Sequence, residues 1–203
     1  MDAFQKIKEI RIVPVVVLNS VEDTIPTISA LVKGDVPIAE ICFRTDCAEA
    51  CIKVASKEFP DALIGAGTVI NEYQAVRAIE CGAKFVVSPG FSEKVHDVCK
   101  KYHIPYIPGV VTPTEIMNVV NRGYKYVKFF PAGEFGGVKA VKSLSSAFPG
   151  ISFLPTGGVN NSNLKDFIDV KSIFAFGGSW VSKGTPEEIT KNCLEARRII
   201  KGE

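Results

Sequence analysis

The chain alternates between short apolar runs and longer segments in which apolar residues recur at helical spacing. The apolar runs are nearly continuous in hydrophobic character, a pattern typical of parallel strands that are buried on both faces. The sequence predicts eight such strands, at residues 11–18, 37–43, 62–67, 84–89, 105–110, 124–130, 151–156 and 172–178.

The segments between these runs carry residues that favour helix ends. Asn71, Ser92 and Thr112 are good N-caps, and Pro113 follows Thr112 at a position where proline suits the first helical turn. Gly82 suits the end of a helix, because glycine adopts a positive φ at no steric cost. The sequence predicts helices at residues 21–34, 47–59, 71–82, 92–102, 112–123, 136–148, 160–169 and 185–202.

Eight strands that alternate with eight helices indicate an α/β fold, and the number favours a closed (β/α)8 TIM barrel. The repeat of roughly 25 residues per unit is near the lower size limit of that fold. No linker, low-complexity tract or charge block interrupts the pattern, so we expect residues 1–203 to form a single barrel domain. The amphipathic stretch at residues 2–10 is expected to form a short N-terminal helix over the lower end of the barrel.

The composition is that of an ordinary globular protein and argues against several kinds of partner. Hydrophobic residues make up 46% of the chain, charged residues make up 23%, and the net charge is +2. The basic residues form no stripe interleaved with aromatic residues, so nucleic acid is not expected as a partner. No apolar run approaches the roughly 18 residues that span a bilayer. The start of the chain also lacks the pattern of a signal peptide, so no membrane partner is expected.

The histidines and cysteines point neither to a metal centre nor to disulfides. His96 and His103 are seven positions apart without a supporting cluster of acidic residues or cysteines, so we expect no metal and no cofactor. The cysteines form no CxxC pair, and we expect reduced thiols in a cytoplasmic protein. The six cysteines are Cys42, Cys47, Cys51, Cys81, Cys99 and Cys193.

Polar residues gather at the carboxyl ends of the predicted strands, where TIM barrels place their active sites. Glu40 lies in the second strand with Arg44 just beyond it, Thr68 follows the third strand, and Lys128 lies in the sixth. A purely structural barrel has no need to place such side chains on successive strand ends. We therefore expect the active site at this end of the barrel.

The loops after the last two strands are rich in glycine. They read PTGG at residues 155–158 and GGSW at residues 177–180, in the region where this fold commonly holds phosphate. Glycine lets backbone N–H groups approach phosphate oxygens, and the helix expected from Asn160 would add partial positive charge at its N-terminus. One glycine pair is explained by a tight turn, but two pairs on adjacent strands favour a phosphate site. Its expected members are Gly157, Gly158, Gly178 and Ser179.

Lys128 lies with Lys125 in the aromatic run YKYVKFFP, at residues 124–131. The two lysines are an odd number of positions apart, so they face opposite sides of a strand. We expect Lys125 to point outward as an ordinary surface lysine and Lys128 to point into the barrel. Because burial disfavours the charged form of a lysine, a buried amine is available at neutral pH to attack a carbonyl carbon and form a Schiff base.

Glu40, Arg44 and Thr68 complete a set of groups suited to imine chemistry. A buried glutamate near the amine can act as general acid and base, an arginine can hold a carboxylate through two hydrogen bonds, and a threonine can donate to the same carboxylate. Each residue also has a purely structural alternative. Glu40 could be a buried carboxylate satisfied by backbone donors, Arg44 could form a surface salt bridge, and Thr68 could cap the end of a strand. Without a metal-ligand set beside them, the combination favours a phosphorylated 2-keto acid as the substrate.

Motifs along nearly the whole chain resemble those of the 2-keto-3-deoxy-6-phosphogluconate (KDPG) and 4-hydroxy-2-oxoglutarate (KHG) aldolases. The matching stretches occur in order as PIAEICFRT, GAGTV, SPG, IPGV, YVKFFPA, GGVKA, PTGGV and GGSW. The resemblance implies a homotrimeric class I aldolase with the TIM-barrel fold. Its reaction would cleave KDPG into pyruvate and glyceraldehyde 3-phosphate.

The resemblance also implies a role for each matching residue. Lys128 matches the Schiff-base lysine, and Glu40 matches the general acid and base. Arg44 and Thr68 match the residues that hold the pyruvyl carboxylate, and Pro89 lies in the matching SPG loop by the carbonyl pocket. The remaining matches, one that shapes the pocket and three that bind phosphate, are Phe130, Gly157, Gly158 and Ser179.

Two departures from the family pattern concern the far end of the substrate. Phe135 is bulky for its position, and residues 110–112 read VVT where the family often has a more hydroxyl-rich stretch. They leave open whether KDPG, its galactonate epimer or KHG is preferred. Two other classes share the phosphate loops. One is a phosphosugar isomerase or epimerase, which typically needs two opposed acid/base groups or a metal, and the other is a non-catalytic phosphoester-binding protein.

Overall fold

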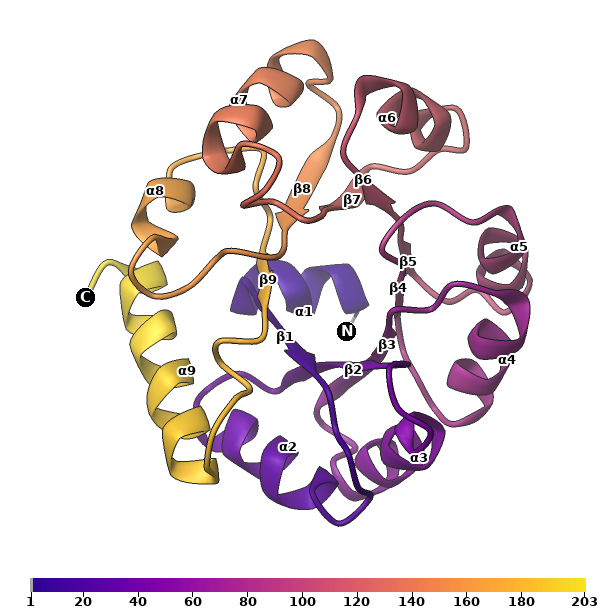
Figure 1. Ribbon diagram of the computed structural model, residues 1–203, viewed down its shortest axis with the longest axis vertical. Coiled ribbons are helices and arrows are strands. Elements are labelled where there is room, and N and C mark those ends of the chain that lie inside the picture. Colours follow the sequence, from indigo (N-terminus) through magenta and orange to yellow (C-terminus); the bar gives the residue numbers. More distant parts are fainter. Residues whose placement is uncertain (1) are drawn as a thin grey trace.

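The computed structural model describes residues 2–203, whose strands form a closed parallel barrel inside a ring of helices (Figure 1). The eight expected strands are all present, so the (β/α)8 prediction is confirmed. One of them is in two parts, so nine strands are labelled: β1 (Ile12–Val16), β2 (Ile38–Cys42), β3 (Leu63–Gly67), β4 (Val86–Val87), β5 (Tyr106–Ile107), β6 (Gly109–Val110), β7 (Tyr126–Phe129), β8 (Ser152–Pro155) and β9 (Phe176–Gly178).

The fifth expected strand, residues 105–110, is divided into β5 and β6 at Pro108. Proline has no N–H to donate to a neighbouring strand, and here the chain changes its partner: β5 pairs with β4, whereas β6 pairs with β7. The Pro108 carbonyl accepts a hydrogen bond from the Lys128 backbone N–H, so the barrel wall continues across the break. Two isolated bridges, Phe153 to Ile173 and Thr156 to Gly177, close the wall between β8 and β9.

Each strand except β5, which leads directly into β6, is followed by a helix that covers the barrel wall, as Figure 1 shows. The expected caps at Asn71, Ser92 and Thr112 are confirmed, since each side chain accepts a backbone N–H, and Thr185 caps the last helix in the same way. The helices are α1 (Ala3–Ile10), α2 (Thr24–Lys33), α3 (Ala48–Glu58), α4 (Glu72–Glu80), α5 (Glu93–Lys101), α6 (Pro113–Val120), α7 (Gly137–Ala147), α8 (Leu164–Ile168) and α9 (Pro186–Lys201).

Helix α8 begins four residues later than the sequence predicts, which corrects the expected N-terminus near Asn160. The Asn160 side chain accepts a hydrogen bond from the Ser162 N–H, and the Asn163 side chain donates to the Gly158 carbonyl. Asparagine side chains that bond to nearby backbone compete with helix formation. The segment after the PTGG loop is therefore a turn held by asparagine side chains, and the helix does not begin at Asn160.

Helix α1 lies across the amino ends of the strands, as the sequence predicts, and appears at the centre of Figure 1. Its Ile7 is fully buried, and the Phe4 and Tyr126 rings lie 4.5 Å apart between centroids. The opposite end, where the strands finish, is left open for chemistry. Among residues 2–203, no helix is both long enough and apolar enough to cross a membrane. All six cysteines are free thiols.

Candidate active site

Lys128 and Glu40 meet inside the barrel, although their strands, β7 and β2, stand on opposite walls. The exposed fraction is 2% for Lys128 and 0% for Glu40, and Lys128 Nζ lies 3.1 Å from Glu40 Oε1. Lys125, three positions earlier, is exposed. The orientation expected from strand alternation is confirmed, and an amine and a carboxylate share one buried hydrogen bond.

The protein leaves that pair few other polar contacts. Glu40 Oε2 is buried and has no hydrogen-bond partner among the described residues. The Lys128 ammonium position lies 5.1 Å from the centre of the Phe130 ring. A buried charge pair is stable only when its geometry is good, and removal of one partner leaves the other uncompensated. Proton exchange along the hydrogen bond would give a neutral amine, the form that attacks a carbonyl.

Gly67 creates the space that the Glu40 carboxylate occupies. A methyl group built on Gly67 would lie 2.3 Å from Glu40 Oε1 and 2.5 Å from its Cγ, far inside van der Waals contact. Gly67 therefore contributes to the site although it carries no side chain, a role that was not predicted from the sequence. The available signal was a second glycine in the short strand GAG, since a glycine inside a strand often marks a close approach.

Cys42 also lies beside Glu40, a position that the sequence did not predict. It lies two positions from Glu40 on β2, so it faces the same side, and its Sγ is 4.0 Å from Glu40 Oε1. Burial, with the Glu40 charge second, raises the pKa of the Cys42 thiol to about 11. The thiol is therefore uncharged at neutral pH and packs beside the carboxylate as a small, weakly polar group.

Arg44 and Thr68 stand together at the mouth of the barrel. Arg44 Nε donates to Thr68 Oγ1 at 3.1 Å, and Arg44 forms no ion pair within residues 2–203. Thr68 has a φ of 54°, in the left-handed region that non-glycine residues rarely adopt. Such strain persists only where surrounding structure holds it, often at functional sites. The pair therefore places a guanidinium next to a hydroxyl, and Arg44 also lines the pocket described below.

Phe130 and Pro89 lie close to Lys128 or to its neighbouring strand, and the Phe130 ring is 5.1 Å from Lys128 Nζ. Gly109 is paired with Lys128 in the sheet, and a methyl group on Gly109 would lie 2.1 Å from the Pro89 carbonyl oxygen. The SPG loop after β4 is thus pressed against the strand that adjoins Lys128. Phe130 follows β7 and is half-buried at the pocket wall.

The two glycine loops form the far wall of a pocket of about 380 Å³. Gly157 and Gly158 have φ values of 87° and 81°, which explains glycine at both positions. Ser179 adds a hydroxyl beside Gly178 on the loop after β9. The structure thus brings both loops to one pocket with Arg44 and Phe130. The pocket is lined by Val15, Arg44, Phe130, Thr156, Gly157, Gly158, Val159, Asn160, Gly178, Ser179, Trp180 and Lys183.

Val15, Thr156, Trp180 and Lys183 were not anticipated from the sequence as pocket residues. Val15 is in the first strand, whose continuous apolar run gave no sign of the site. Thr156 and Trp180 belong to the PTGG and GGSW motifs, so the adjacent glycines could have indicated that these two residues also line the pocket. Lys183 lies beyond GGSW, where no local pattern distinguishes it from an ordinary surface lysine.

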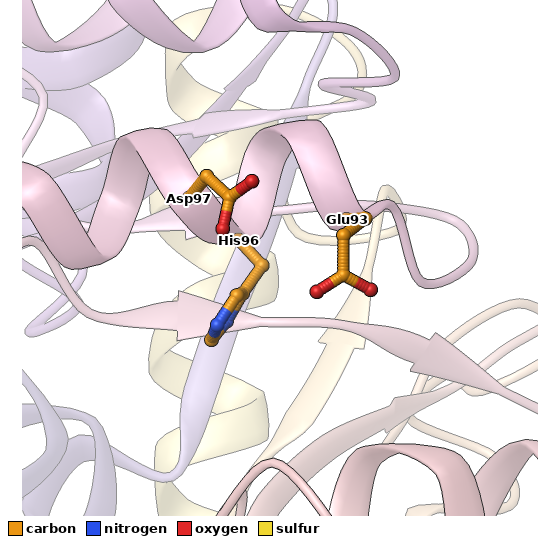
Figure 2. A group of neighbouring side chains, drawn as sticks. All are labelled: Glu93, His96 and Asp97. Carbon is orange, nitrogen blue, oxygen red and sulfur yellow. The ribbon is translucent and has the colours of Figure 1, made fainter.

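A larger hollow, of about 750 Å³, lies at the amino ends of β5 and β7. It contains none of the expected site residues and is lined chiefly by aromatic and basic side chains, including His96. Figure 2 shows His96 with Glu93 and Asp97 on α5, where their potential ligand atoms lie within 4.8 Å of one another. Two of the three already have protein partners: Arg122 pairs with Glu93, and Tyr124 OH lies 2.6 Å from His96 Nδ1. Size alone does not identify the functional pocket.

Comparisons with known proteins identify the family to which the chain belongs. A family model described as "Aldolase: KDPG and KHG aldolase" matches residues 4–195. The "KHG/KDPG aldolase" of Escherichia coli (strain K12) is 40% identical over 191 residues, which are 91% of this chain and 90% of that protein. The "2-dehydro-3-deoxy-phosphogluconate aldolase" of Dickeya dadantii (strain 3937) is 41% identical over 170 residues, 84% of this chain and 80% of that protein.

A solved structure gives the same likeness in three dimensions. It is a KDPG aldolase from Legionella pneumophila with pyruvate captured at low pH as a covalent carbinolamine intermediate. Its TM-score to this chain is 0.88, with 35% sequence identity, and the match covers 92% of this chain and 93% of that one.

Proposed function

Because the chain belongs to the KDPG and KHG aldolase family, we propose that it cleaves its substrate through an imine formed on Lys128. The chain is a lyase with the aldolase activity of that family. The observation that carries the residue assignment is the buried hydrogen bond of 3.1 Å between Lys128 Nζ and Glu40 Oε1. A lysine held beside a single carboxyl group has both a nucleophile and a proton carrier within reach.

In the proposed reaction, the neutral Lys128 amine attacks the keto carbon, C2, and the carbonyl oxygen takes up a proton. Glu40, through a water molecule, passes protons as this carbinolamine loses water to give a cationic imine. Glu40 then takes the proton of the C4 hydroxyl, the C3–C4 bond breaks, and its electron pair moves towards the imine nitrogen. The aldehyde leaves, and the remaining enamine is protonated on C3. Hydrolysis releases pyruvate and restores the amine.

The two ends of the substrate are assigned to opposite sides of the pocket. Arg44 and Thr68 would hold the carboxylate on C1 through charge-assisted hydrogen bonds. The backbone N–H groups around Gly157, Gly158 and Gly178, with the Ser179 hydroxyl, would hold the phosphoryl group. Pro89 and Phe130 would confine the reacting carbon atoms between them. The substrate is thus a 2-keto acid with an anionic far end.

The named relatives support this substrate class. One is called a 2-dehydro-3-deoxy-phosphogluconate aldolase, and the Legionella pneumophila enzyme was captured with pyruvate as a carbinolamine, the first adduct in the scheme above. We propose KDPG as the principal substrate and KHG, cleaved to pyruvate and glyoxylate, as a second one. The galactonate epimer of KDPG uses the same chemistry and differs only in hydroxyl configuration.

We further propose that residues 1–203 work as one domain, as a homotrimer, and in the cytoplasm. The family resemblance supports the trimer, and the six free cysteines suit a reducing compartment. Light scattering coupled to size exclusion should give the mass of three chains. A mass of one chain would contradict the trimer and leave the chemistry unaffected.

The experiment that tests the function is release of pyruvate from purified KDPG, KHG and the galactonate epimer, followed with lactate dehydrogenase and NADH. Lys128→Ala should abolish release. The unaltered protein should also exchange the methyl hydrogens of pyruvate with deuterated solvent, because the enamine protonates reversibly. A phosphoester-binding protein would bind without exchange, and an isomerase or epimerase would release no pyruvate. Either result would refute the proposal.

A further inference from the structure

Lys183 is a charged member of the pocket that the proposed mechanism does not use. The lining of the 380 Å³ pocket includes two charged side chains, Arg44 and Lys183, and both are cationic. No acidic side chain lines the pocket among the described residues. Arg44 stands on the β2 side with Thr68, whereas Lys183 follows β9 and the GGSW loop. The pocket thus offers one cation near each of two walls.

The backbone that carries Lys183 is held firmly on both sides. Before it, the Ser182 N–H donates to the Ser179 carbonyl at 3.2 Å, and the Ser182 hydroxyl donates to the Val15 carbonyl at 2.6 Å. After it, Thr185 and Glu188 form the capping box that starts α9. These contacts fix the Lys183 backbone at the rim of the pocket, one turn beyond Ser179.

The GGSW loop before Lys183 is joined to the segment that follows the other glycine loop, PTGG. Trp180 Nε1 donates to Asn161 Oδ1 at 2.7 Å, and Asn161 lies on the segment that follows Gly157 and Gly158. The Asn192 side chain donates to the Trp180 carbonyl at 3.2 Å, which joins the loop to α9. These hydrogen bonds connect the backbone of Lys183 with both glycine loops, so the position of the lysine relative to the backbone N–H donors of those loops is fixed.

The Lys183 side chain is exposed and forms no ion pair within residues 2–203. An unpaired ammonium on a long stem can move to an anion that arrives beside it, and lysine is a common partner of phosphate as a point charge. The backbone N–H groups of the glycine loops supply directed hydrogen bonds but only partial charge. A phosphate monoester carries nearly two negative charges at neutral pH. The lysine supplies the full positive charge that this wall otherwise lacks.

We propose that Lys183 is a specificity-determining residue that contacts the phosphoryl group of the substrate and favours phosphorylated over unphosphorylated 2-keto acids. This inference rests on the proposed function. Because the lysine is far along the substrate from C2, its contact is made equally in the ground state and the transition state. Such uniform binding lowers KM and leaves kcat unchanged.

The test compares KDPG with its unphosphorylated analogue, 2-keto-3-deoxygluconate, in Lys183→Ala, Lys183→Arg and the unaltered protein. Lys171→Ala is the matched control, because Lys171 is an exposed lysine outside the pocket. Lys183→Ala should raise KM for KDPG by about 3- to 10-fold, the scale of an exposed charge pair with a doubly charged group. Its kcat should stay within about 2-fold, consistent with uniform binding. KM for the unphosphorylated analogue should not change, and Lys183→Arg should restore most of the preference.

A second measurement is independent of turnover. Titration of the protein with inorganic phosphate in a calorimeter should show weaker binding for Lys183→Ala than for Lys171→Ala, and the difference should shrink as salt is added. Equal losses on both substrates would indicate a structural role and overturn the proposal, as would an unchanged KM ratio. If the unaltered protein neither cleaves KDPG nor forms the pyruvate imine, the proposed function itself fails.

Discussion

Gly67→Ala tests whether the position of the Glu40 carboxylate controls the reaction. The added methyl group would lie 2.3 Å from Glu40 Oε1 and 2.8 Å from its Cδ. Because unstrained contacts of this kind begin near about 3.5 Å, the carboxylate must move by roughly 1 Å. Oε1 is 3.1 Å from Lys128 Nζ in the present structure. A displacement of that size directed away from the amine would bring the separation to about 4 Å, beyond hydrogen-bond range.

The expected loss of activity follows from that displacement. A misplacement of about 1 Å commonly costs about 10²-fold in rate, and a positioned acid/base group contributes about 10²–10⁴-fold. We expect kcat/KM for KDPG to fall by at least about 10²-fold, which corresponds to about 2.7 kcal/mol of transition-state stabilisation. In the Glu40→Gln background, Gly67→Ala should cost little more, because residues that act as a unit are not additive.

Two glycine variants separate this effect from loss of folding. A methyl group on Gly65 would lie 2.3 Å from the Phe85 ring, so Gly65→Ala overpacks the same strand without touching the carboxylate. Gly150→Ala meets no atom within 4 Å and should be neutral. Activity is measured with lactate dehydrogenase, and folding by thermal melting. If Gly67→Ala is folded and within about 3-fold of the unaltered protein, the argument from carboxylate position is wrong.

Three further predictions concern other parts of the molecule. Glu40→Gln should lower kcat by about 10²–10⁴-fold, and steady-state assays with KDPG check this; a loss under 10-fold would exclude Glu40 as the proton carrier. Arg44→Lys should raise KM for pyruvate in the hydrogen-exchange assay by about 10-fold, because an ammonium cannot form the bidentate pair; an unchanged KM would remove Arg44 from the carboxylate site. Burial raises the pKa of the Cys99 thiol from 9.0 to about 12 in the folded protein. The buried neutral thiol therefore contributes fully to stability below pH 9, the pKa of the thiol in the unfolded chain, and this contribution is lost as the pH rises towards the pKa of the folded state. Between about pH 8 and pH 10.5 the free energy of unfolding should fall by about 2 kcal/mol less in Cys99→Ala than in the unaltered protein, as measured by urea denaturation, and equal falls would contradict this.

The fold was predictable because its signals are local and repeat along the chain. Each strand is a short apolar run, and caps such as Asn71, Ser92 and Thr112 mark the helices between them. The exceptions arise from backbone chemistry that competes with these patterns. Pro108 divides the fifth strand because it cannot donate a hydrogen bond, and Asn160 delays α8 because its side chain bonds to neighbouring backbone.

The site was predictable where a polar residue interrupts an apolar strand. Lys128 and Glu40 are conspicuous for that reason, and strand alternation gives the direction of the lysine. Gly67 and Lys183 could not be identified in this way. Gly67 matters because it lies close to the Glu40 side chain on the neighbouring strand. Lys183 matters because it lines a pocket formed by loops that are distant in the sequence. Such relations exist only after the chain has folded.

The central claim is that Lys128 forms the covalent bond to the keto acid. The direct measurement is reduction with borohydride in the presence of pyruvate, followed by peptide mapping with mass spectrometry. Lys128 should carry one carboxyethyl group, its labelling should require pyruvate, and Lys128→Ala should remain unlabelled. An unmodified protein, or a label on another lysine, would contradict the account.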